Sequence, residues 1–184
     1  MSRSLGQRLL RRGIVLGVIC VITVAGFYLS LILSARPLSA EEMSHVESAI
    51  EVLDRAGFEK EVHYLRYYTF FRGNDNWLNA MVPKENAYAA TNYPFEILTL
   101  YPDFFVYTED DVERAAILLH EARHLQGFDE PDAYEFVWKN KSKIGWTREN
   151  YGSSIVWRNV RKQTMEIQPG MFICDFNELN DCFE

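Results

Sequence analysis

The longest apolar run in the chain covers residues 13–33, which read GIVLGVICVITVAGFYLSLIL and carry no charge. An α-helix rises about 1.5 Å per residue, so this run is roughly 30 Å long and matches the hydrocarbon core of a bilayer. A buried helix of a soluble protein would show a polar stripe, and this run has none. We therefore expect a transmembrane anchor over residues 13–34. A cleaved signal peptide is the alternative, but its apolar region usually covers only about 7–15 residues.

The chain beyond the anchor changes between helical and extended patterns. Residues 43–56 place apolar side chains at helical spacing, and Gly57 follows as a stop. Segments rich in β-branched and aromatic residues favour strands. These predicted strands cover residues 61–71, 77–82, 87–91 and 95–100.

Two further helices follow the predicted strands. Thr108 with Asp111 three positions on has the form of a capping box, and the helix it begins should end near Gln126, where Gly127 is suited to the C′ position. Residues 147–167 predict a C-terminal amphipathic helix. Its inward side chains are expected to be Ile155, Val156, Trp157 and Val160. The fold class is therefore α+β, with a small, mostly antiparallel sheet beside a central helix and flanking helices, in one domain over 41–184.

Charge is divided unevenly along the chain. Residues 1–36 hold five arginines and no acid, so the remainder has 19 − 5 = 14 basic against 26 acidic side chains. An acidic body of this kind excludes nucleic acid as a partner, because phosphates require a basic face. Four of the five arginines precede the apolar run, so the positive-inside rule puts segment 1–12 in the cytoplasm and residues 37–184 in the periplasm or outside the cell.

The cysteines fit such an exported domain. Cys20 lies inside the predicted anchor, whereas Cys174 and Cys182 flank a short polar stretch near the C-terminus. In an oxidising compartment these two thiols are expected to close a disulfide loop. Two unpaired thiols on a loose tail are the alternative.

The strongest chemical signal is His120-Glu121-Ala122-Arg123-His124, which fits the pattern H-E-x-x-H. Residues four apart on a helix lie one above the other, so His120 and His124 can offer two imidazole nitrogens to one metal ion. Glu121 then projects toward a water beside the metal, where a general base is needed. The alternative is two histidines and a glutamate on a solvated helix face.

A catalytic zinc site needs a third protein ligand, and no histidine follows His124, so a carboxylate must serve. Here the chain resembles the zincin metallopeptidases over roughly residues 95–140. Gly127 and Glu130 fall on the glycine and final-ligand positions of the metzincin layout. The string from Glu130 through Ala133 to Phe136 is similar to the gluzincin motif E-x-x-A-x-x-F, although its gap from His124 is shorter than in that group.

Both alignments select Glu130 as the third ligand, with Asp129 capping a new helix and Pro131 in its first turn. Glu135 is the next candidate, followed by Asp132 and Asp129. Arg123 should point away from the metal, as a surface group or one that supports the ligands.

The resemblance implies a zinc-dependent hydrolase, most simply a peptidase, with Zn²⁺ held by His120, His124 and Glu130 and with Glu121 as the base. It also implies an edge strand that receives a substrate backbone, for which 96–100 is the candidate, although an ordinary core strand is equally compatible. Tyr134 and Tyr151 are candidate donors to an oxyanion.

Two other functions remain open. One is a non-catalytic, anchored envelope domain whose metal site is structural and which serves as an interaction module. The other is a hydrolase that shares the metal site but acts on lipid or cell wall.

Overall fold

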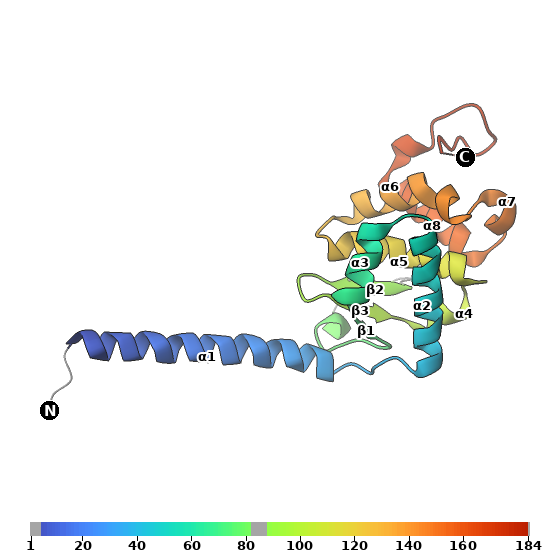
Figure 1. Cartoon of the computed structure of the whole chain (residues 1–184). Coiled ribbons are helices and arrows are strands. Elements are labelled where there is room, and N and C mark those ends of the chain that lie inside the picture. Colours follow the sequence, from blue (N-terminus) through green and yellow to red (C-terminus); the bar gives the residue numbers. More distant parts are fainter. Residues whose placement is uncertain (1–4, 82–87, 184) are drawn as a thin grey trace.

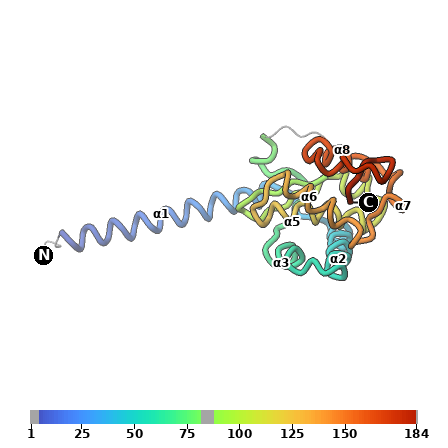
Figure 2. Tube along the Cα trace, turned by 90° about the horizontal axis from the view of Figure 1, so that it is seen from above, coloured from blue at the N-terminus to red at the C-terminus, as the bar shows by residue number. Residues whose placement is uncertain are grey.

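The computed structural model of the chain describes residues 5–81 and 88–183. Helix α1, Leu5–Leu33, extends away from the remaining elements (Figures 1 and 2). Within the described part of the chain it is the one helix long and apolar enough to cross a membrane. Its side chains are exposed over most of its length, and Leu31 in the last turn is buried against the domain. The helix begins eight residues before the predicted anchor.

Helices α2, Ala40–Arg55, and α3, Glu59–Tyr67, come next and pack against each other. The helix predicted over 43–56 is confirmed, and Ser39 with Glu42 forms its capping box. The strand predicted over 61–71 is wrong, because most of that segment is α3. Val62 and Leu65, three positions apart, are buried on one face of α3, and this helical spacing outweighs the aromatic composition.

The sheet has three short strands: β1, Phe70–Arg72; β2, Ala89–Asn92; and β3, Ile97–Leu100. Strand β3 lies in the centre, parallel to β1 and antiparallel to β2. The sheet is therefore mixed and not mostly antiparallel, and the edge-strand role expected for 96–100 is wrong because β3 has a neighbour on each side.

The return strand expected over 77–82 is also wrong as far as the structure describes it. The Asn76 side chain accepts hydrogen bonds from the backbone N–H groups of Leu78 and Asn79, and a 3₁₀ turn, η1, Asn79–Met81, follows. This local side-chain bonding competes with strand pairing. Val82 and Ala87, at the ends of two expected strands, lie outside the described residues.

Helix α5, Asp111–Leu125, is central, and it packs against α2, α3, α6 and β2. It follows the short helix α4, Pro102–Val106. Its N-cap is Asp110, which accepts hydrogen bonds from the N–H groups of Val112 and Glu113, so the expected cap at Thr108 is wrong. The Thr108 hydroxyl donates instead to the carbonyl of Phe104. The predicted end is confirmed, since Gly127 follows with a φ of +83°.

The remaining helical elements follow α5 in the chain, and of these α6 packs on α5 and α8 packs on α6. They are α6, Glu130–Asn140; η2, Lys141–Ile144; α7, Arg148–Tyr151; α8, Ile155–Ile167; and η3, Pro169–Met171. The single helix expected over 147–167 is therefore divided, because Ser154 caps a new helix by accepting from the Trp157 N–H. Val156 and Trp157 are buried as expected, whereas Ile155 is exposed.

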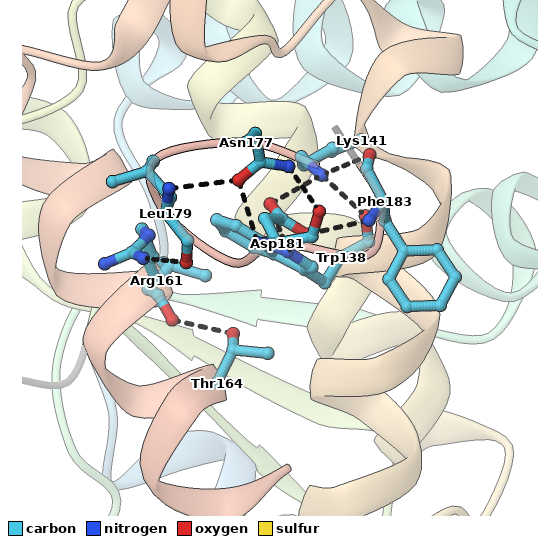
Figure 3. Close-up of polar contacts among 9 residues, drawn as sticks. Trp138, Lys141, Arg161, Thr164, Asn177, Leu179, Asp181 and Phe183 are labelled. Carbon is cyan, nitrogen blue, oxygen red and sulfur yellow. Dashed lines mark hydrogen bonds and ion pairs between the residues drawn. The ribbon is translucent and has the colours of Figure 1, made fainter. Parts of the chain in front are cut away.

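The C-terminal segment folds back on α6 and η2. Cys174 and Cys182 form the expected disulfide. Asp181, inside this loop, is buried beside Trp138 and Lys141 (Figure 3). The disulfide loop is thus attached to the same helix, α6, whose first residue is Glu130.

Candidate metal centre

Helix α5 brings His120 and His124 together, as their spacing predicts. Their Nε2 atoms lie 3.0 Å apart, and both side chains are largely buried. The His124 Nδ1 lies 2.9 Å from the Phe128 carbonyl oxygen, which can only accept. Nδ1 therefore carries a proton in either form of the ring, and Nε2, which faces His120, is the nitrogen that can bind a metal once it is deprotonated. Ligating histidines in metal sites commonly have their tautomer fixed by such a bond.

The third group, Glu130, reaches the histidines through a tight reversal of the chain. Gly127 takes a left-handed conformation that other residues adopt at a cost. Asp129 then caps α6 by accepting from the Asp132 N–H. As a result the Glu130 carboxylate lies 3.2 Å from His120 Nε2 and 3.5 Å from His124 Nε2.

These separations are compatible with one metal ion held between the three side chains. Bonds of about 2.0–2.1 Å in a tetrahedron put neighbouring ligand atoms roughly 3.3–3.4 Å apart. The two Nε2 atoms lie 3.0 Å apart, Glu130 Oε2 lies 3.2 Å from His120 Nε2, and the other oxygen, Glu130 Oε1, lies 3.5 Å from His124 Nε2. One ligand atom from each residue lies within 4.8 Å of the other two. Two imidazoles and one carboxylate can therefore hold a metal ion, and the chemistry of this donor set suits zinc.

His124 and Glu130 stabilise each other's charged forms. Hydrogen bonds from His120 and His124 hold the pKa of the Glu130 carboxyl well below its usual range. Burial lowers the pKa of His124, but the Glu130 carboxylate and the nearby Glu121 raise it by more, to about 9. Glu130 is consequently ionised at neutral pH, the state in which a carboxylate binds a metal.

Glu121 is buried next to the cluster and is held by strand β2. The Thr91 hydroxyl donates a 2.7 Å hydrogen bond to Glu121 Oε2. One oxygen of the carboxylate is therefore fixed, and the side chain lines the same cavity as His120 and Glu130. Sequence reasoning missed Thr91; no spacing rule links it to Glu121, because the contact depends on β2 lying beside α5.

A cavity of about 210 Å³ extends from this cluster into the domain. Its polar end holds His120, Glu121, Glu130 and Tyr134. Its other walls are mainly apolar and include Ala116, Ile117, Val137, Trp146 and Val160. The cavity therefore joins the candidate metal site to a space suited to an apolar group.

The other candidate third ligands lie apart from the cluster of His120, His124 and Glu130, whereas Tyr134 lies beside it. Glu135 forms an ion pair with Lys139 and accepts from Gln168, and it lies outside the three-residue cluster, as do Asp129 and Asp132. Tyr134 lies beside His120, with ring centroids 4.5 Å apart, and burial raises the pKa of its phenol.

Tyr151 is wrong as an oxyanion donor. Its hydroxyl donates to Asp110 at the opposite end of α5 from the histidines, and this bond closes the N-terminus of the helix.

Arg123 supports the turn that carries the third ligand, as the expectation of a supporting group allows. Its guanidinium lies over the rings of Phe128 and Phe136, 3.7 and 4.2 Å from their centroids, and 3.4 Å from the buried Glu61 carboxylate. These contacts join α3, α5 and α6 directly behind the histidines.

Comparison of the chain with protein-family models, with curated proteins and with solved structures gives no match.

Proposed function

We propose that the chain is a membrane-anchored, zinc-dependent hydrolase that cleaves peptides. The observation that carries this proposal is the convergence of His120, His124 and Glu130, whose ligand atoms lie within 4.8 Å of one another, with the buried Glu121 on the same cavity. A purely structural metal site has no use for a buried carboxylate beside its ligands. The resemblance to zincins over roughly residues 95–140 points the same way.

His120, His124 and Glu130 are the proposed ligands. Zinc at these donors would polarise a carbonyl group and lower the pKa of a coordinated water. Glu121 accepts the proton of the attacking water through the oxygen that Thr91 leaves available and passes it to the leaving amine. Tyr134, on the same cavity and beside His120, is the proposed donor to a developing oxyanion.

The proposed substrate is an extended peptide that lies along β2. The Tyr101 N–H donates to the Tyr88 carbonyl, and this register turns the main-chain groups of Ala89 and Thr91 away from β3. Among the described residues no strand pairs with that outer edge of β2. An added strand there would pass Glu121, and an apolar side chain next to the cleaved bond would enter the cavity.

The proposed location is a membrane, with α1 crossing the bilayer and the domain on its non-cytoplasmic side. The arginines before the apolar run favour this orientation. The Cys174–Cys182 disulfide supports an oxidising compartment.

The first test is the metal content of the purified full chain in detergent, measured by elemental analysis. The full chain is needed because the end of α1 packs on the domain. We expect about one zinc per chain, lost in His120→Ala and weakened in Glu130→Ala. Two matched controls, Glu135→Ala and the exposed His63→Ala, should keep the metal. A folded chain that binds no zinc when zinc is supplied would overturn the proposal.

The second test separates catalysis from a structural metal. Glu121→Gln keeps an acceptor for the Thr91 hydroxyl, so we expect normal folding and full zinc content. Cleavage of a peptide library should fall by roughly 100-fold to 10,000-fold, the usual contribution of a general base. Zinc binding without cleavage by either protein would favour the anchored interaction module.

A further inference from the structure

The domain surface around the end of α1 is rich in exposed aromatic side chains. Tyr68, Phe70, Trp77 and Tyr93, which we name the aromatic rim, are 41–61% exposed. They come from the end of α3, the start of β1, the loop before η1 and the β2–β3 loop. Tyrosine and tryptophan have an apolar body and a polar tip, and both are enriched where hydrocarbon meets water.

The last turns of α1 are packed on this surface. The Phe27 ring lies 5.5 Å from those of Trp77 and Phe95, and the Tyr28 ring lies 6.2 Å from that of Phe70. The Trp77 indole also donates to the Ser30 hydroxyl at 3.1 Å. Trp77 and Phe70 of the rim are therefore held at a fixed depth relative to α1.

The length of α1 then sets that depth. From Gly13, the first residue after the arginines, to Phe27 the helix rises only roughly 21 Å, and a bilayer core is about 30 Å thick. The apolar run needs to continue to Leu33 to span it. Domain residues that pack on Phe27 and Tyr28 consequently reach the outer layer of the bilayer.

We propose that the aromatic rim is a lipid-contact surface, seated in the interfacial layer of the bilayer that α1 crosses. This inference rests on α1 as a membrane span and not on the metal site. Tyr93 connects the rim to the turn between α5 and α6, because its side chain lies against Gly127: a Cβ added to Gly127 would come within 3.4 Å of the Tyr93 hydroxyl. Through Tyr93 the rim holds the turn at Gly127 near the lipid surface. For the proposed hydrolase, on which this last step alone rests, the substrates favoured are chain segments that emerge from the membrane.

The test uses tryptophan fluorescence of the full chain in lipid nanodiscs, with brominated phospholipid as the quencher. Trp138, Trp146 and Trp157 are buried in the domain core, so Trp77 is the tryptophan that lipid can reach. We expect brominated lipid to remove at least half of the Trp77 signal, taken as the difference between the wild type and Trp77→Phe. Aqueous iodide should leave that signal nearly unchanged.

Two controls use the Trp77→Phe background. Val24→Trp, at an exposed position of α1, reports whether the helix spans the bilayer and should be strongly quenched by brominated lipid. Ile173→Trp lies in the C-terminal segment, on the opposite side of the domain from α1 in Figure 1, and should respond only to iodide.

Quenching of the Val24→Trp control without quenching of Trp77 would overturn the rim and leave the anchor in place. Quenching of neither would overturn both. The wild-type measurement is decisive even if Trp77→Phe fails to fold, since a wild-type signal that brominated lipid does not change excludes the rim from the bilayer. Zinc content is measured separately, so neither result depends on the proposed enzyme.

Discussion

Asp181 offers a sharp test of how the C-terminal loop stabilises the domain. Its side chain is fully buried and accepts hydrogen bonds from the Trp138 indole at 3.0 Å and the Phe183 N–H at 2.8 Å (Figure 3). The Lys141 ammonium, also buried, lies 3.4 Å away. Asp181→Ala removes the acceptor of the indole and the negative partner of the lysine in one step.

The expected loss follows from the burial of this pair. Removing one partner of a buried ion pair generally costs about 3–5 kcal/mol, because the other charge remains in a low-dielectric site. Lys141 keeps the Phe183 carbonyl at 2.7 Å, so we expect the lower end, about 3 kcal/mol. For a chain of this length that corresponds to a fall in Tm of roughly 6–12 °C.

The assay is thermal unfolding of the full chain in nanodiscs, followed by circular dichroism. Lys141→Met and the double variant complete a thermodynamic cycle. We expect the double variant to recover part of the loss, because it removes the buried lysine charge together with the carboxylate. A loss below about 1 kcal/mol for Asp181→Ala, or strictly additive effects in the cycle, would refute the reasoning, since a real buried pair requires a coupling.

Four further predictions concern other contacts. Thr91→Val should lower kcat of the proposed reaction by about 10-fold or more with zinc content unchanged, because the proposed base, Glu121, loses its hydroxyl donor. Peptide cleavage by Thr91→Val at the wild-type rate would count against this role of Thr91. Val160→Trp should fill the cavity and lower kcat/KM by about 10-fold for substrates with large apolar side chains, relative to those with alanine. An unchanged ratio of kcat/KM between the two kinds of substrate would mean that the apolar side chain binds outside this cavity. Cys174→Ser should reduce stability by about 2–3 kcal/mol in denaturant, since it opens a short disulfide loop, and added reductant should then have no further effect. The Arg36 guanidinium lowers the pKa of Glu42 to about 2, so this pair stabilises the fold above pH 4.5 and stops doing so as the pH falls toward 2. The wild type should be more stable than Glu42→Gln by about 1 kcal/mol at pH 7, and this difference in unfolding free energy should disappear over that pH range. A difference that does not change with pH would contradict the prediction.

The candidate site could be predicted where its geometry is local. The positions of His120 and His124 follow from the helical repeat, and the end of α5 follows from Gly127. Asp129 before Pro131 likewise identifies the start of α6. Each of these signals lies within a few residues of the structure it determines, so the sequence alone was enough.

The sheet could not be predicted in the same way, because its order depends on contacts distant in sequence. Strand β3 is central only because β1 pairs with it from the other side, 27 positions away between Phe70 and Ile97. Composition also misleads over 61–68: the aromatic side chains favour a strand, yet the segment is helix α3 as far as Tyr67, and Tyr68 after it is exposed at the surface. If the aromatic rim contacts lipid, those side chains reflect the surroundings of the domain more than its secondary structure.

The short gap between His124 and Glu130 also has a structural reason. A third ligand on a separate distant helix requires a long connection, whereas here the chain reverses at once. Gly127 turns the backbone, and the Phe128 carbonyl returns to His124 Nδ1. The next helix then begins with the Glu130 carboxylate already at the histidines, since Glu130 is the first residue of α6. Phe128, which accepts from His124 Nδ1, thus belongs to the same turn that brings Glu130 to the histidines, and a gap of six positions is sufficient to bring the three candidate ligands together.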